Sequence, residues 1–150
     1  MSMKFVSIST FFVFLIAGLG LHVGPSDAEA VKEVKVGEGG LHIQSWFNNT
    51  SFLDLAEDYS EAVADGKRLA ILFEQRGCPY CREMHQVNFA TPEVVDYIKA
   101  HFNIVQLNMW GDREVTDFDG EILSEKDFAR KHRVMFTPTI LYPGAEGKEV

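Results

Sequence analysis

Two cysteines placed directly after an apolar run constrain the fold of this chain most. The run Leu69-Ala70-Ile71-Leu72-Phe73 has the length and continuity of a strand that is buried on both faces. Arg76-Gly77 ends the run, and Cys78-Pro79-Tyr80-Cys81 opens a predicted helix that extends to about Asn88. A C-x-x-C pair at a strand-to-helix junction is typical of a redox site. The pair therefore predicts both a local fold and a chemistry.

The rest of the chain repeats this alternation of helices and short apolar strands. Ser51 with Asp54, and Ser124 with Asp127, resemble capping boxes, and Thr91-Pro92 is a typical helix start. These signals predict an α/β fold, in which helices cover both faces of a sheet. The expected helices span 51–65, 78–88, 91–102 and 124–132, and the expected strands 69–73, 103–109 and 134–142, with an acidic connector at 111–120.

The first 30 residues have the pattern of a secretory signal peptide. Lys4 is the only charge before Asp27, the apolar run Phe11 to Leu19 follows it, and Ala28-Glu29-Ala30 is a small-x-small end. We expect cleavage after Ala30; an uncleaved membrane anchor is the alternative. The predicted organisation is a signal peptide at 1–30, a lead-in segment at 31–50 and one domain at 51–150.

Charge and cysteine count exclude several classes of protein. The formal net charge of −8, from 14 basic and 22 acidic residues, argues against a nucleic-acid partner. Two cysteines exclude a disulfide-dense scaffold and a four-cysteine zinc site. Export would place the pair in an oxidising compartment.

The position of the pair assigns a role to each sulfur. Unpaired backbone N–H groups and the positive end of the helix dipole favour the thiolate at a helix N-terminus. Cys78, at the exposed end, is the expected nucleophile, and Cys81, one turn into the helix, is the expected resolving thiol. No cofactor is needed, because the pair itself carries two electrons. A structural disulfide, or a metal site made of Cys78, Cys81 and His85, is the alternative.

Several segments of the chain resemble the thioredoxin-fold family, and within it the periplasmic thioredoxins of bacterial sulfur-oxidation systems (SoxW type). The resemblance implies a thioredoxin-like fold with a central mixed sheet. It also implies a cis Thr137-Pro138 bond that faces the disulfide and, with Pro79 and Tyr80, contacts the substrate. The segments that resemble the family are 73–81, 87–90, 106–111, 113–118 and 136–139.

The same resemblance implies a function and a location. The chain would be a periplasmic, monomeric thiol–disulfide oxidoreductase that reduces disulfides of periplasmic proteins, including sulfur carriers. A membrane thiol-electron carrier would reduce it in turn. An oxidase or a glutaredoxin-like enzyme shares these motifs, and a metal-binding chaperone would use Cys78, Cys81 and His85 instead.

The chain departs from the family pattern at two places. Thioredoxins carry a buried Asp six residues before the first cysteine, where this chain has Leu72. Glu74 lies two residues later, so strand alternation points it to the same face. We expect either that Glu74, directly or through a water, takes the proton of Cys81, or that it is an exposed strand-end side chain. The family's last strand and closing helix would follow Val150, so we expect the domain at 51–150 to be incomplete at its C-terminal end.

Overall fold

The computed structural model describes residues 34–144, 147 and 148. The predicted signal peptide and its cleavage site lie outside the described residues. Among the helices that are described, none combines the length and the apolar character needed to cross a bilayer.

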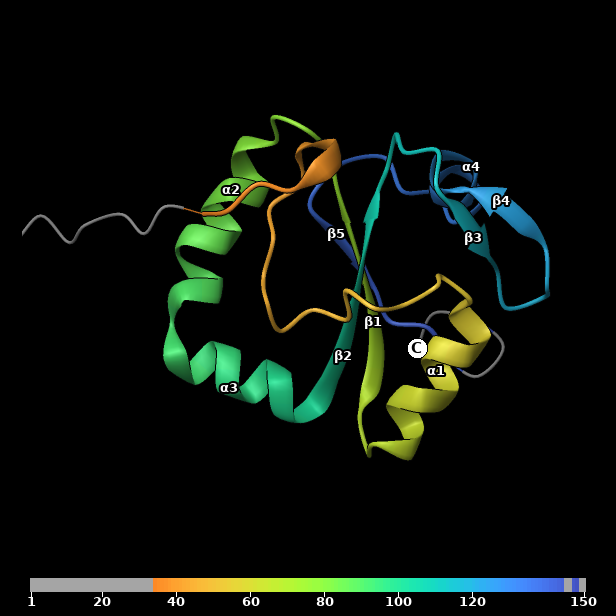
Figure 1. Cartoon of the computed structure of the whole chain (residues 1–150), viewed down its shortest axis with the longest axis horizontal. Helices are drawn as coiled ribbons and strands as arrows, with labels where there is room; N and C mark the ends of the chain where they lie inside the picture. Colours follow the sequence, from red (N-terminus) through yellow and green to blue (C-terminus); the bar gives the residue numbers. More distant parts are fainter. Residues whose placement is uncertain (1–33, 145–146, 149–150) are drawn as a thin grey trace, which may run out of the picture. The chain divides into compact units, whose positions relative to one another are not determined.

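A three-stranded mixed sheet forms the centre of the fold (Figure 1). Strand β1 (Arg68–Glu74) lies between β2 (Phe102–Asn108) and β5 (Thr139–Leu141). It pairs in parallel with β2 and antiparallel with β5. Every residue of β1 except the first is buried, as the continuous apolar run predicted. The expected α/β fold with a mixed sheet is confirmed.

Helices cover the two faces of this sheet. Helices α2 (Pro79–Gln86) and α3 (Pro92–His101) lie on one face, and α1 (Leu55–Ala64) and α4 (Glu125–Lys131) on the other (Figure 1). The side chains of β1 alternate between two apolar clusters: residues 69, 71 and 73 pack with α1 and α4, whereas residues 70 and 72 face α2 and α3. Alternation therefore places Glu74 on the face covered by α2.

A short hairpin lies where the sequence predicted only an acidic connector. Strand β3 (Glu114–Thr116) pairs antiparallel with β4 (Ile122–Ser124), and Val115 is fully buried. Strands of three residues are too short to show a period, and the surrounding aspartates gave the pattern of a loop. The predicted strand at 134–142 is also shorter, because only Thr139–Leu141 pairs with β1.

Two of the three predicted helix caps differ from expectation. Asp54, not Ser51, caps α1 by accepting from the Glu57 N–H at 3.1 Å, while the Ser51 hydroxyl donates to Asp58. Thr91 precedes α3, but its hydroxyl donates backwards to the Val87 carbonyl. The Ser124 cap of α4 is confirmed.

Residues 34–50, called the lead-in segment below, pack on the sheet face that carries α2 and α3. The segment contains one 3-10 turn (Glu38–Gly40); a second such turn (Asn88–Ala90) joins α2 to α3. The Phe47 ring is buried among apolar side chains of that face. The Asn48 N–H donates to the Ile104 carbonyl at 2.8 Å, and the Gln106 amide donates to the His42 carbonyl at 2.8 Å. These contacts fix the segment along β2.

Candidate redox site

A tight turn joins β1 to the cysteine pair. The Cys78 N–H donates to the Gln75 carbonyl, and Gly77 takes a positive φ of 74°, which glycine adopts without a side-chain penalty. Cys78 then caps α2, since its Sγ accepts from the Cys81 N–H at 3.1 Å. Pro79 occupies the first helical turn, where an N–H is not needed.

The two cysteines form a disulfide that is covered unequally. Cys81 is fully buried, whereas Cys78 keeps 4% of its surface exposed. A partner can therefore reach Cys78 more easily than Cys81. The roles of nucleophile for Cys78 and resolving thiol for Cys81 stay predictions.

Thr137 brings the segment before β5 to the disulfide. The Thr137-Pro138 bond is cis, as the resemblance implied. The Thr137 hydroxyl donates to Cys78 Sγ at 3.3 Å, and the Thr137 carbonyl oxygen lies 3.6 Å from the same sulfur. The fold thus unites residues that are 59 positions apart.

Two exposed aromatic rings flank this contact in the chain. Tyr80 lies between the cysteines and is 69% exposed; Phe136 immediately precedes Thr137 and is 72% exposed. Of the predicted substrate-contacting residues, Pro79 and Tyr80 are exposed, Pro138 is half-buried and Thr137 is buried.

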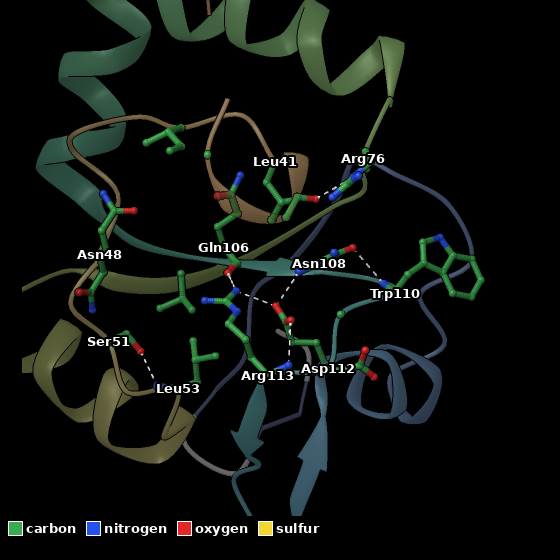
Figure 2. Close-up of a pocket in the computed structure, with 17 residues that line it drawn as sticks. Leu41, Asn48, Ser51, Leu53, Arg76, Gln106, Asn108, Trp110, Asp112 and Arg113 are labelled. Carbon is green, nitrogen blue, oxygen red and sulfur yellow. Dashed lines mark hydrogen bonds and ion pairs between the residues drawn. The ribbon is translucent and has the colours of Figure 1, made fainter. Parts of the chain in front are cut away.

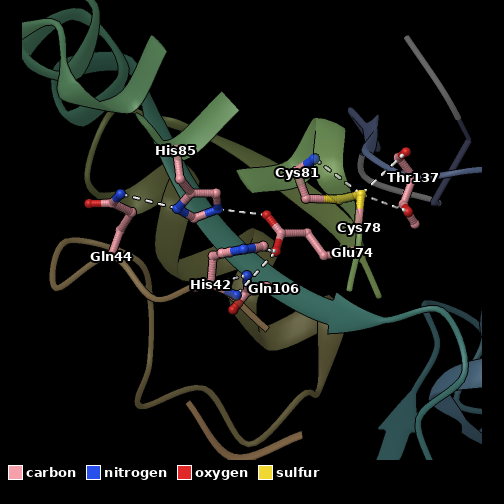
Figure 3. Close-up of polar contacts among 8 residues, drawn as sticks. All are labelled: His42, Gln44, Glu74, Cys78, Cys81, His85, Gln106 and Thr137. Atoms are coloured by element: carbon pink, nitrogen blue, oxygen red, sulfur yellow. Dashed lines mark hydrogen bonds and ion pairs between the residues drawn. A yellow bond between two sulfur atoms is a disulfide. The ribbon is translucent and has the colours of Figure 1, made fainter. Parts of the chain in front are cut away.

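Glu74 is not an exposed strand-end side chain, so that interpretation was wrong. Its carboxylate is completely buried and each of its oxygens contacts a different histidine (Figure 3). His85 Nε2 lies 2.6 Å from Oε1, and His42 Nδ1 lies 3.3 Å from Oε2. The His42 backbone N–H also approaches Oε2, at 3.4 Å.

His85 does not join the cysteine sulfurs in a metal site. Its Nε2 faces Glu74, and its Nδ1 lies 3.1 Å from the Gln44 side-chain amide nitrogen (Figure 3). The structure instead brings His42, Glu74 and His85 together, with one ligand atom of each within 4.8 Å of the others. The predicted Cys78–Cys81–His85 grouping is therefore not formed.

Sequence reasoning missed His42 and Gln44. The helical spacing of Cys81 and His85 placed both side chains on one side of α2, and strand alternation placed Glu74 beneath them. His42, by contrast, follows a glycine-rich stretch without a period. No local pattern could have shown that the lead-in segment reaches the end of β1.

A cleft of about 880 Å³ lies between the lead-in segment and β2 (Figure 2). Arg76, Trp110 and Arg113 line it together with polar side chains. The Trp110 indole N–H donates to the Gln75 side chain at 2.6 Å, which places one end of the cleft beside the turn that leads to Cys78.

One family model and two solved structures are similar to parts of this chain. A family model described as a thioredoxin-like domain matches residues 55–150. Among solved structures, a thioredoxin from Thermus thermophilus is 27% identical, with a TM-score of 0.44, over 61% of this chain and 68% of that one. A thioredoxin-fold protein from Helicobacter pylori is 28% identical, with a TM-score of 0.42, over 55% of this chain and 56% of that one. No curated protein sequence matches the chain.

Proposed function

Since the chain belongs to the thioredoxin-like domain family, we propose that it is an exported thiol–disulfide oxidoreductase that reduces disulfides of periplasmic proteins. One observation carries the proposal. Cys78 caps α2 next to Thr137 and keeps 4% of its surface exposed, while Cys81 is fully buried one turn further along the helix. This is the arrangement that two-step disulfide exchange requires.

The reaction begins with the reduced pair. The Cys78 thiolate attacks one sulfur of the substrate disulfide, a mixed disulfide forms, and the first substrate thiolate leaves and takes a proton from water. Cys81 then loses its proton to Glu74 or to a water bound there, and attacks Cys78 Sγ. The second substrate thiolate leaves and is protonated by water. The substrate gains two electrons, which the cysteine pair loses as its disulfide forms.

The surface around Cys78 supports a polypeptide substrate. Tyr80 and Phe136 offer exposed aromatic contacts, and the backbone at Thr137-Pro138 can pair with an extended segment, as in strand addition. Pro79, Tyr80, Thr137 and Pro138 are therefore the proposed substrate-contacting residues.

The electron source and the pathway rest on the sequence resemblance. Segments 73–81 and 106–111 are similar to the SoxW type, which favours a membrane thiol-electron carrier as the reductant and sulfur-carrier proteins among the substrates. The chain would act as a monomer. The opposite direction, in which the chain donates its disulfide, uses the same residues and differs in the reduction potential.

Trapping the mixed disulfide tests this function. The reduced chain is mixed with insulin as a model protein disulfide, and the products are analysed by mass after acid quenching. We expect Cys81→Ser to accumulate a covalent complex through Cys78, and Cys78→Ser to form none. Insulin reduction by Cys78→Ser at the wild-type rate, or no complex with Cys81→Ser, would contradict the proposal.

A further inference from the structure

We propose that His42, in the lead-in segment, is the terminal acceptor of the Cys81 proton, which reaches it through the buried carboxylate of Glu74. This inference rests on the proposed function and extends its second step. It gives His85 a different role, that of fixing the Glu74 carboxylate in place. The active unit thus includes a residue that lies outside the part of the chain matched by the family model.

Burial makes a second proton carrier necessary. Glu74 has no exposed surface, so its carboxylate cannot exchange a proton directly with bulk water. Within the described residues, the hydrogen-bond and ion-pair partners of its carboxylate are His42 and His85. A proton that Glu74 takes from Cys81 must therefore leave through one of these two rings.

The hydrogen bonds of His85 prevent its ring from accepting a proton from Glu74. When the Gln44 amide donates to its Nδ1, this nitrogen carries no proton, and the Nε2–H donates to Glu74 Oε1. The ring is then neutral, and its nitrogen that faces Glu74 already holds a proton. His85 orients the carboxylate but has no vacant nitrogen turned toward it.

The contacts of His42 leave its route open. Nδ1 faces Glu74 Oε2 at 3.3 Å, while the ring keeps 8% of its side-chain surface exposed. Among the described residues no buried side-chain nitrogen lacks a partner, and none of the hydrogen bonds of His42 uses Nε2, so Nε2 reaches solvent. The ring therefore connects the sealed carboxylate to water through its two nitrogens.

The helix brings the donor to the same carboxylate. Cys81 and His85 are four residues apart on α2, so their side chains share one face on consecutive turns, about 6 Å apart. Since His85 contacts Glu74, the Cys81 side chain lies on the face of α2 that is turned toward this carboxylate.

The proposed step conserves protons and electrons. The Cys81 S–H bond breaks as the Glu74 carboxylate takes the proton, and neutral His42, in the tautomer that carries its proton on Nε2, then accepts a proton at Nδ1 from the Glu74 carboxyl group. The Cys81 thiolate forms the bond to Cys78 Sγ, and the bond from Cys78 to the substrate sulfur breaks with its electron pair. The imidazolium of His42 then releases a proton from Nε2 to water.

The side chains of His42, Glu74 and His85 could also bind a metal ion. The hydrogen-bond geometry favours the relay, because each carboxylate oxygen already faces a different ring nitrogen, at 2.6 and 3.3 Å. Binding of Co²⁺ distinguishes a metal site from the relay.

The experiment separates the two steps of exchange. The reduced chain reacts in a stopped-flow instrument with 5,5′-dithiobis(2-nitrobenzoate), which releases one thionitrobenzoate as Cys78 attacks and a second as Cys81 resolves the mixed disulfide. The leaving thiolate needs no proton, so the Cys81 proton is the one transferred in the second phase. Absence of the first phase would refute the proposed function itself.

Isosteric variants then test the relay. His42→Asn keeps a polar group facing Glu74 but cannot carry a proton, and we expect its second phase to slow about tenfold or more with the first phase unchanged. Added imidazole should restore the second phase in His42→Ala. His85→Ala removes the donor to Glu74 Oε1, and added imidazole should leave its second phase slow, because His85 holds the carboxylate and does not carry the proton.

The controls define what would overturn the inference. His101→Asn alters a histidine at the end of α3, away from this site, and should leave both phases unchanged. A slow second phase in Glu74→Gln with a normal one in His42→Asn would make Glu74 the final acceptor. Stoichiometric binding of Co²⁺ to the oxidised chain, lost in His42→Asn, would make the three residues a metal site instead.

Discussion

Two exposed aromatic side chains lie next to the residues of the disulfide contact in the sequence. Tyr80 and Phe136 are exposed, yet they flank a contact, Thr137 to Cys78, that is almost closed to solvent. An exposed aromatic ring beside a reactive sulfur contributes to binding of a large partner and little to the chemistry of the sulfur.

Replacing Tyr80 should therefore affect large and small disulfides differently. Tyr80→Ser is expected to lower kcat/KM for insulin by about three- to tenfold, equivalent to about 1 kcal/mol of lost contact, while the rate with 5,5′-dithiobis(2-nitrobenzoate) stays within twofold. Tyr97→Ser, at an exposed ring on α3, is the matched control. Equal losses with both disulfides would show that Tyr80 acts on the sulfur rather than on the partner.

Among the larger elements, the lead-in segment behaves as part of the core. Phe47 is 5% exposed and makes edge contacts with the rings of Trp46 and Phe89, so it anchors the segment that carries His42. Phe52, five residues later, is 94% exposed. Phe47 and Phe52 are the same residue type and lie close together in the sequence, but only Phe47 is buried, so substitution of Phe52 is a control for substitution of Phe47.

Phe47→Ala should lower the free energy of unfolding by about 3–4 kcal/mol, since it removes a buried ring and leaves a cavity. Phe52→Ala should change it by no more than about 0.5 kcal/mol. Urea unfolding of both variants measures the difference. A cost below about 1 kcal/mol for Phe47→Ala would show that the lead-in segment is only loosely attached.

A charge cluster joins the C-terminal end of α4 to the β3–β4 hairpin. The Lys131 ammonium contacts the carboxylates of Asp117, Asp119 and Glu121, and this contact raises the pKa of Lys131. Asp117 is 3% exposed. Its charge therefore depends on partners within the protein more than on water.

This cluster predicts a pH-dependent stability. Burial alone would raise the pKa of Asp117, but hydrogen bonds from Lys131, the Phe118 N–H and His132 together hold it below its usual range. A carboxylate whose pKa is lowered by folding stabilises the folded state at pH values above its unfolded pKa. This contribution to stability is lost as the pH falls through the pKa of the folded state. Lys131→Gln should thus cost about 1 kcal/mol at neutral pH and progressively less below about pH 4.

Urea unfolding at neutral and acidic pH measures this difference. Lys126→Gln is the control, since Lys126 pairs with an exposed carboxylate, Asp112, and its loss should leave stability unchanged. A cost for Lys131→Gln that is equal at both pH values would contradict the assignment to Asp117.

The elements that the sequence predicted well are those with a strong local signal. The apolar runs gave β1 and β2 to within one residue at each end, and Pro79 and Pro92 marked the starts of α2 and α3. The hairpin was missed because its strands have three residues each. The contact of His42 with Glu74 joins residues 32 positions apart, and only the assembled fold could reveal it.

At the scale of the whole molecule, the sheet separates two apolar clusters and carries the reactive chemistry at the end of its central strand. Cys78 follows β1 by four residues, Thr137 precedes β5 by two, and Glu74 ends β1, so pairing of these strands assembles the site. The formal charge of −8 favours partners that are not strongly acidic.

The chain has only two cysteines, so its redox state is that of a single couple. The most direct test of the central claim is the reduction potential of Cys78–Cys81, measured by equilibration in graded thiol–disulfide buffers, alkylation, and counting of reduced cysteines by mass. We expect about −250 mV or lower, the range of a reductase that receives electrons from another carrier. A potential of about −120 to −150 mV would identify an oxidant that donates its disulfide, and would contradict the proposed direction of electron flow.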